Sequence, residues 1–479
     1  MVNSRKLAGI AIAAGLTLAG FMAGPAAANA AGTPCGGTGS VTTATGTLGD
    51  GATYLIQCPA GAWNGSLFLY SHGYVVPGSS NPATDTSDSQ TGDWLLSQGY
   101  ALAGSSYAMT GWAVASALPD QINTLNAFEG AYGKPKQTIA WGDSLGGMIT
   151  AGLIQDYPGR FSGAVPMCGV LSGGVATWNT ALDAAFAFQQ LIDPKIEVVN
   201  INDDTINLAE AETALAEAQA TPQGRARIAL AAALGDTPGW YTTGAAEPAP
   251  TDYADQEQAQ FEWDSQVDFP FIFDFRAQLE SLAGGNPSWN TGVNYFQDIA
   301  KSTDLTEVKA LYQTAGLNLN ADLRTLNDAP RISADPSAVA YLAKNVAYDG
   351  EISVPTLTVH TTGDGLVVPE NEQAYRSVVD RDGRGYLLQQ LFVDRAGHCA
   401  FTPAEEITSI QVLLNRLATG QWNIPDPATL NDQAAALGAA DNTLPPAFTR
   451  YSPAQYLRPY DLPPVFPFPG GGTSAPVVP

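Results

Sequence analysis

The sequence predicts an α/β protein with a mostly parallel central sheet, helices on both faces of that sheet, and a large, mainly helical insertion. Three observations support this fold class. Short apolar runs alternate with helical patterns over the first third of the chain, the alternation stops at about residue 171, and it returns after residue 350. Regular alternation of strand and helix is typical of parallel sheets covered on both faces.

The sheet is expected to begin with a hairpin. Residues 40–48 and 52–58 are rich in Val, Thr, Tyr and Ile, and they flank a Gly-Asp-Gly turn signal. The next two runs, 66–71 and 100–107, are continuously apolar. Such runs indicate strands that are buried on both faces.

The remaining core elements follow in alternation, first up to Cys168 and then again after the insertion. We expect helices at 120–132, 146–157 and 403–417, and strands at 137–141, 162–168, 355–361 and 386–393. The chain of 479 residues also exceeds the roughly 250–300 at which a single core stops growing. The core is therefore predicted in two parts, 31–170 and 351–420, on either side of a lid or cap at 171–350.

The insertion and the C-terminus have their own character. The insertion contains an Ala-rich helical stretch at 209–234 and an aromatic cluster at 261–275. Residues 421–479 are expected to form a Pro-rich C-terminal extension, part of it docked on the core.

The first thirty residues are predicted to be a signal peptide. Arg5 and Lys6 precede an uncharged apolar stretch, and Ala-Asn-Ala at 28–30 offers a cleavage site after Ala30. An N-terminal membrane anchor is the alternative, but the apolar stretch is short and rich in glycine. Because no later stretch is long and apolar enough to span a bilayer, we expect a secreted protein without stable membrane insertion.

The charge balance argues against two classes of partner. The chain has 21 basic and 46 acidic residues, a net charge of −25. Such a chain repels nucleic acid and anionic membranes, so neither is expected as a partner. The charge does not identify a substrate, since it serves solubility equally well.

Four cysteines in an exported chain suggest two disulfides, although three pairings are possible. Cys35 and Cys58 both lie in the N-terminal region near the ends of the hairpin, which favours that pair and leaves Cys168 with Cys399. Free buried thiols are the alternative. A metal site is not indicated, since there is no C-x-x-C spacing and the chain has only three histidines. No organic cofactor is indicated either.

The chemistry is concentrated at residues 142–147, which read Gly-Asp-Ser-Leu-Gly-Gly. This is a G-x-S-x-G pattern between a predicted strand and a predicted helix, the context in which a strained turn exposes a nucleophilic serine. The glycines are required because side chains would clash in so sharp a turn. Ser144 is therefore the predicted nucleophile; the alternative is a tight turn with an incidental serine.

A serine hydroxyl needs a base, and only three histidines are available. His398 follows the last predicted strand, which is where a base is expected for this chain order. His72 ends an early strand, and His360 lies inside a strand as a packed residue. His398 is therefore the predicted base.

The acid that orients the base should lie between the nucleophile and the base in the sequence. Asp364 follows a predicted strand and is flanked by glycines, so its carboxylate can hold one ring nitrogen of His398. Asp394 is the competitor, but it lies only four residues before His398 and is better explained as structural.

An oxyanion hole is expected from two backbone N–H groups. One belongs to Leu145, which follows the nucleophile at the start of a helix. The other belongs to the loop after the strand at 66–71, where His72 and Gly73 form an H-G pair. We assign it to Tyr74.

These residues and their order resemble the α/β-hydrolase superfamily. The resemblance covers about 35–170 and 350–420, and more closely the motifs at 141–147 and 165–169 resemble exported bacterial hydrolases of that superfamily. It implies the α/β-hydrolase fold, a cap in the place of the insertion, and hydrolysis of an ester or amide by acyl transfer. The fold hosts many substrates, so none is implied.

The resemblance also bears on the second disulfide. A Cys168–Cys399 bridge would hold the His398 loop beside Ser144. Exported tannase-like and feruloyl-esterase-like hydrolases place a disulfide beside the triad as well, with one cysteine next to the serine. This chain has Gly142 and Asp143 at that position, so it departs from their pattern.

The lid is expected to cover the site and to set specificity. Trp178, Phe186 and Phe188 are candidates for an acyl pocket, although lid aromatics more often form the lid's own core. The chemistry favours a carboxylic ester hydrolase acting on a small-molecule or polymeric ester. The alternatives are a serine exopeptidase, in which lid acids such as Asp203 and Asp204 would hold an amine, and a non-catalytic binding protein.

Overall fold

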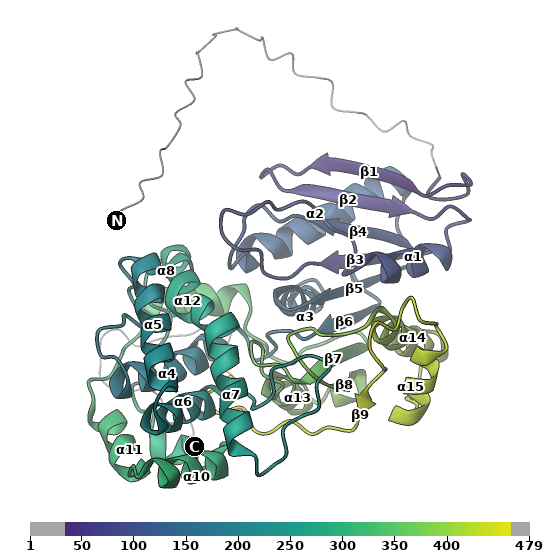
Figure 1. Ribbon diagram of the computed structural model, residues 1–479. Coiled ribbons are helices and arrows are strands. Elements are labelled where there is room, and N and C mark those ends of the chain that lie inside the picture. The colour runs from purple at the N-terminus through teal and green to yellow at the C-terminus, as the bar shows by residue number, and fades with distance from the viewer. Residues whose placement is uncertain (1–33, 461–479) are drawn as a thin grey trace, which may run out of the picture.

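The computed structural model describes residues 34–460, and the predicted signal peptide lies outside these residues. The core is a nine-stranded sheet in the order β1-β2-β4-β3-β5-β6-β7-β8-β9 (Figure 1). β2 pairs antiparallel with β1 and with β4, all strands from β4 to β8 are parallel, and β9 returns antiparallel to β8. The strands are β1 (Thr42–Thr47), β2 (Thr53–Cys58), β3 (Ser66–Ser71), β4 (Ala101–Ser105), β5 (Gln137–Asp143), β6 (Gly163–Met167), β7 (Thr356–Gly363), β8 (Leu388–Ala396) and β9 (Phe448–Thr449).

Helices cover both faces of the sheet, as predicted. Successive strand residues point to opposite faces, so Leu67 and Leu69 of β3 join one apolar cluster while Phe68 and Tyr70 join another. One face packs against α2 (Val114–Tyr132), α3 (Leu145–Asp156) and α13 (Glu370–Arg381), and the other against α1 (Ser89–Ser97) and α14 (Pro403–Thr419). Burial on both faces explains why the central strands read as continuous apolar runs.

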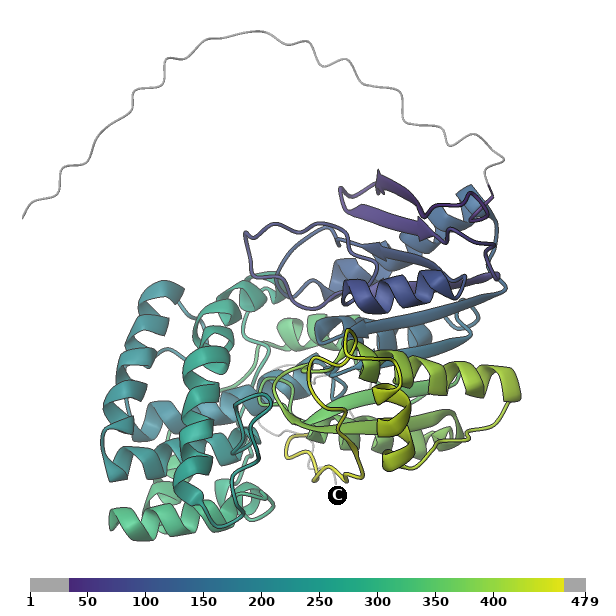
Figure 2. The same cartoon turned by 45° about the vertical axis from the view of Figure 1, so that its right-hand side comes forward.

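The segment between β6 and β7, called the lid below, is helical and has a hydrophobic core of its own. It lies at one end of the sheet, beside the core helices (Figures 1 and 2). Its elements are α4 (Gly174–Leu191), α5 (Asp204–Gln219), α6 (Pro222–Gly235), α7 (Tyr253–Trp263), α8 (Arg276–Ala283), α9 (Tyr295–Ile299), α10 (Leu305–Ala315), α11 (Leu319–Asp328) and α12 (Pro336–Asn345). The boundaries predicted for the lid and the two core parts stay predictions.

The Ala-rich stretch predicted at 209–234 belongs to two helices rather than one. α5 ends at Gln219, and Thr221 caps α6 by accepting a hydrogen bond from the N–H of Gly224. Pro222 occupies the first helical position, where its missing N–H costs nothing.

One rod of the lid contains two π-helical turns. It runs from α7 through η1 (Asp264–Asp268) and η2 (Phe271–Phe275) into α8. Pro270 lies between the two turns, and a proline in a helix interior clashes with the preceding turn. π-turns widen the helix and change which side chains face the core, and they are frequent at functional sites.

The C-terminal extension crosses back to the lid. After α15 (Pro427–Ala435) and β9, Arg458 forms a buried ion pair with Asp183 of α4 at 3.5 Å. No helix of the described residues is long and apolar enough to cross a membrane.

Candidate active site

Ser144 occupies the sharp turn between β5 and α3. Its backbone has φ 60° and ψ −125°, a conformation that costs a non-glycine residue strain. Added side chains at Gly142 and Gly146 would place Cβ 2.3 and 1.9 Å from the carbonyl oxygen of Ser71. Gly147 is equally constrained, since its Cβ would lie 2.6 Å from the oxygen of Met167. All three glycines therefore allow the backbone of the turn to pack directly on β3 and β6.

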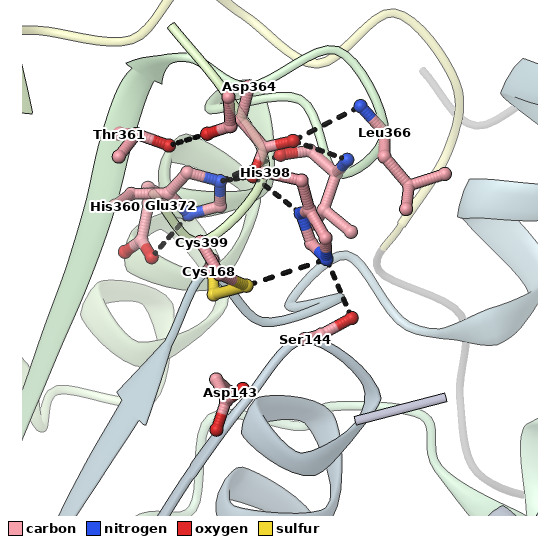
Figure 3. The surroundings of a disulfide bond; sticks show 12 residues. Asp143, Ser144, Cys168, His360, Thr361, Asp364, Leu366, Glu372, His398 and Cys399 are labelled. Atoms are coloured by element: carbon pink, nitrogen blue, oxygen red, sulfur yellow. Dashed lines mark hydrogen bonds and ion pairs between the residues drawn. A yellow bond between two sulfur atoms is a disulfide. The ribbon is translucent and has the colours of Figure 1, made fainter. Parts of the chain in front are cut away.

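His398 and Asp364 meet this serine from the ends of two neighbouring strands (Figure 3). Nε2 of His398 lies 2.7 Å from Oγ of Ser144, and Nδ1 lies 2.8 Å from Oδ2 of Asp364. Asp364 directly follows β7, and His398 lies two residues beyond β8. The structure thus joins the three predicted residues in one chain of hydrogen bonds, with Nδ1–H donating to the carboxylate.

The carboxylate of Asp364 is fully buried and well solvated by protein donors. Its Oδ1 accepts hydrogen bonds from the N–H groups of Leu366 and Val367, at 3.1 and 3.0 Å. Burial alone would raise the pKa of Asp364, but His398 and His360 beside it lower the pKa below its ordinary value. The group therefore stays ionised and can fix the orientation of the His398 ring.

His360 is the residue at this site that the sequence analysis missed. It was predicted only as a packed strand residue, and it is indeed fully buried on β7. Its Nε2 lies 3.5 Å from Oδ2 of Asp364 and 2.7 Å from the oxygen of Val367, while Nδ1 lies 3.2 Å from Oε1 of Glu372 (Figure 3). Burial lowers the pKa of His360, but the carboxylates of Asp364 and Glu372 outweigh burial and raise it to about 10. A buried imidazolium therefore lies behind the acid.

The two competitors named from the sequence lie elsewhere. Asp394 is exposed, and its carboxylate accepts a hydrogen bond from Thr362 at 3.2 Å. His72 stacks on Tyr107 with ring centroids 4.0 Å apart, and its ring nitrogens contact the carbonyls of Gly73 and Ser106. Burial lowers the pKa of His72. Its contacts place it under the Gly73 loop rather than at Ser144.

The loop after β3 lies beside the serine hydroxyl. A Cβ on Gly73 would be 3.7 Å from Oγ of Ser144. Tyr74 and Leu145 line the same cavity as Ser144, and Leu145 begins α3, where backbone N–H groups have no helical acceptor. Their assignment to an oxyanion hole stays a prediction.

Both predicted disulfides are present, Cys35–Cys58 and Cys168–Cys399. The second joins the residue after β6 to the residue after His398, and Sγ of Cys399 lies 3.4 Å from Nε2 of His398 (Figure 3). Six non-glycine residues of the described chain have positive φ, and Ser144, Cys168 and Cys399 are three of them. Strained backbone gathers at functional sites, where the surroundings must hold it in place.

Ser144 and His398 open into a cavity of about 340 Å³ between the core and the lid. The lid contributes Trp178, as predicted, and the C-terminal extension contributes Tyr456. The prediction for Phe186 and Phe188 is wrong. Phe186 stacks on Tyr295 and Phe188 packs edge-on against Phe269, because the C-terminal half of α4 runs into the lid's own core.

The lid docks directly on the loops that carry the three residues. Glycines flank Asp364 because a Cβ on Gly365 would lie 2.3 Å from the ring of Trp263, and one on Gly363 would lie 3.0 Å from Trp240. On the opposite side, Tyr74 contacts Phe271 and Phe275 of η2, with ring centroids 5.0 and 5.6 Å apart. The α7–α8 rod therefore packs against the loops after β3 and β7 that border the cavity.

Two carboxyl groups of this rod, Asp264 and Asp268, also line the cavity. They are only 6% and 7% exposed, and burial raises the pKa of both, to about 8 for Asp264. Asp203 and Asp204, the lid acids named from the sequence, lie at the start of α5, where Asp203 caps the helix. Across residues 34–460, no group of three or more His, Cys, Asp and Glu side chains is placed to hold a metal ion.

The strand order, the serine turn and the loops at the ends of β7 and β8 define a hydrolase of the α/β-hydrolase superfamily. The chain is 30% identical over 431 residues to o-phthalyl amidase of Xanthobacter agilis, a match that spans 83% of this chain and 91% of that protein. The chain therefore belongs to the same family as this amidase. Residues 47–235 also match the model of a tannase-like family of unknown function (DUF6351).

Similar solved structures include several esterases. An esterase from Aspergillus oryzae has a TM-score of 0.41 and 13% identity, with 79% of this chain and 80% of that chain covered. Feruloyl esterase B from Aspergillus oryzae has a TM-score of 0.38 and 12% identity, with 79% of this chain and 81% of that chain covered. The rice cell-wall-degrading esterase LipA from Xanthomonas oryzae has a TM-score of 0.36 and 14% identity, with 79% of this chain and 90% of that chain covered.

Proposed function

We propose that this protein is a secreted serine hydrolase that cleaves carboxylic esters through an acyl-enzyme, with Ser144 as nucleophile, His398 as base and Asp364 as the orienting acid. The observation that carries the proposal is the continuous hydrogen-bonded chain from Oγ of Ser144 through His398 to Asp364, which opens into the cavity. The two disulfides support an oxidising, extracellular setting.

The geometry supports the following sequence of steps. Oγ of Ser144 attacks the acyl carbon while its proton passes to Nε2 of His398. The negative charge that develops on the carbonyl oxygen is stabilised by the N–H groups of Tyr74 and Leu145. His398 then returns the proton to the leaving alcohol as the C–O bond breaks, and an acyl group remains on Ser144. Water, deprotonated by His398, releases the acid and regenerates the serine.

Amide hydrolysis is the second candidate for the same site. The relative in Xanthobacter agilis is an amidase, and acyl transfer to serine cleaves amides when the base protonates the leaving nitrogen. A serine exopeptidase is one form of this candidate, and it would need lid acids in the cavity. Asp264 and Asp268 occupy that place, whereas Asp203 and Asp204 do not.

The proposal is tested with p-nitrophenyl esters of several chain lengths and with amino-acid and peptide p-nitroanilides, using wild type and Ser144→Ala in parallel. We expect ester turnover that is lost in the variant and much weaker anilide turnover. Anilide turnover at comparable efficiency would move the assignment to a peptidase or amidase. A fluorophosphonate that fails to label Ser144 in the wild type would reject the nucleophile.

A further inference from the structure

We infer that Asp264 and Asp268 form a cation subsite, so that the cavity selects substrates that carry a positively charged ammonium group. The inference rests on the proposed function, because it names the substrate class of the same cavity. It concerns recognition by the lid and leaves the acyl-transfer chemistry as described.

The first support is that both carboxyl groups face the cavity without a protein partner. Each side chain is more than nine-tenths buried, and each lines the cavity. Within residues 34–460, neither carboxyl has a hydrogen bond or an ion pair with another side chain or with the backbone. A buried polar group without a partner costs free energy, and a ligand that supplies the partner recovers that cost.

The second support is the sign of the charges around the cavity. Besides tyrosine and cysteine, the ionisable residues that line the cavity are Asp143, Asp264, Asp268 and His398. Within the described chain, no Lys or Arg lines it. Asp143 already accepts a hydrogen bond from Tyr70 at 2.6 Å. A substrate anion would therefore find no counter-charge here, whereas a cation would find two carboxyl groups that can ionise once its positive charge lies beside them.

The third support is aromatic. Tyr74, Trp178 and Phe271 line the same cavity as the two carboxyl groups. Aromatic faces attract cations through the ring quadrupole, and boxes of aromatic and acidic side chains are the usual receptors for substituted ammonium groups. The net charge of −25 would also steer a cation toward the protein.

The π-turn of η1 explains how one short segment supplies both carboxyl groups. Asp264 and Asp268 are its first and last residues, and the preceding Trp263 is anchored against Gly365 beside the triad acid. Asp268 lines the same cavity as Ser144 and His398, and the nearby charge of Asp364 contributes to the raised pKa of Asp268. The subsite and Ser144 therefore belong to one cavity, which a single substrate can occupy.

The test compares two esters that differ only in charge: p-nitrophenyl 4-(trimethylammonio)butyrate and its carbon isostere, p-nitrophenyl 5,5-dimethylhexanoate. The measured quantity is the ratio of their kcat/KM values. Wild type is expected to prefer the cationic ester, and Asp264→Asn and Asp268→Asn are each expected to reduce the ratio about tenfold, because an amide cannot ionise beside the trimethylammonium group. Asp274→Asn removes the same charge from the same rod outside the cavity and should keep the wild-type ratio.

Binding without turnover separates this inference from the proposed function. Calorimetry on Ser144→Ala with (3-hydroxypropyl)trimethylammonium and its isostere 4,4-dimethylpentan-1-ol should show tighter binding of the cation, weakened by Asp264→Asn. If the cation binds but neither ester is hydrolysed, the proposed function is wrong and the cation subsite is still supported. Equal binding of the two alcohols, or a ratio of kcat/KM that neither Asp variant changes, would overturn the subsite.

Discussion

The two walls of the cavity beside Ser144 differ in how their polar groups are satisfied. On the core wall, Ser144, His398 and Asp364 are bonded to one another, and the carboxylate has two further backbone donors. On the lid wall, Asp264 and Asp268 have no partner in the described chain, and Nε1 of Trp178 is buried without one.

Under the proposed function, this difference separates the groups that carry out the reaction from those that recognise the substrate. Groups that stabilise a transition state work best when they are already oriented, because no reorganisation is then needed during the reaction. Groups that select a substrate gain most when the substrate itself supplies their missing partner. Substitutions on the core wall should therefore reduce kcat for every substrate, and those on the lid wall should change substrate preference and stability.

The largest effect is expected from Asp364→Asn. The amide cannot hold Nδ1–H of His398 as the carboxylate does, so kcat should fall about 10⁴-fold with KM little changed. Asp394→Asn is the matched control, since Asp394 is exposed and its carboxylate accepts a hydrogen bond from Thr362 rather than from His398. Ester kinetics on both variants measure the contrast, and an equal loss in the two would reject Asp364 as the orienting acid.

The core wall was predictable because its geometry is local. A strand, the G-x-S-x-G turn and a helix place Ser144 regardless of what the lid does, and the ends of parallel strands meet at one edge of the sheet. The late histidine and the glycine-flanked aspartate follow from that order. What the sequence did not reveal was His360, because an alternating strand residue has no local signal for its contact with Asp364.

The lid wall was not predictable, since its side chains are placed by long-range packing. Whether Phe186 faces the cavity or the lid core depends on how α4 packs against α6 and α9, and no local pattern sets that. The π-turn that carries Asp264 and Asp268 follows no local sequence pattern that would predict it. Tyr456 reaches the cavity only because the C-terminal extension folds back over the lid.

The two disulfides offer the next test, because one lies on the core wall and the other is remote. Replacing Cys168 and Cys399 together by alanine should lower kcat about a hundredfold, since the His398 loop loses its link to β6 and small misplacements of a catalytic group are costly. It should also reduce the free energy of unfolding by roughly 3 kcal/mol. Replacing Cys35 and Cys58 should reduce stability without changing kcat. Equal kcat losses in both double variants would show that the Cys168–Cys399 bridge affects activity only through stability.

The buried carboxyl group of Asp264 on the lid wall should make the free energy of unfolding depend on pH. Burial, and then the charge of Glu257, raises the pKa of Asp264 from 3.8 to about 8. The folded state therefore binds a proton that the unfolded state releases between pH 4 and 8, and this group lowers stability as pH rises through that window. Asp268 on the same turn and Asp364 on the core are the other acids of this region.

Asp264→Asn removes this dependence. The variant should match wild type near pH 4 and exceed it by about 5 kcal/mol near pH 8, as measured by urea denaturation at several pH values. Asp255→Asn, an exposed position on α7, serves as the control for a lost surface charge. A gain for Asp264→Asn that does not grow with pH would show that this carboxyl is ionised in the folded state throughout.

The smallest effect is expected from His360→Gln, which removes the buried imidazolium behind Asp364. The change should lower kcat about tenfold and leave KM unchanged, because His360 acts through the acid as a positioning residue. Loss of the positive charge of His360 should strengthen the attraction between Asp364 and the protonated form of the base, so the acidic limb of the kcat profile, which the base sets, should move to higher pH. Thr358→Val breaks only the hydrogen bond to the far oxygen of Glu372 and should leave the profile in place. If both variants lose activity with an unshifted profile, His360 contributes only to the packing of the core and does not act on the reaction through Asp364.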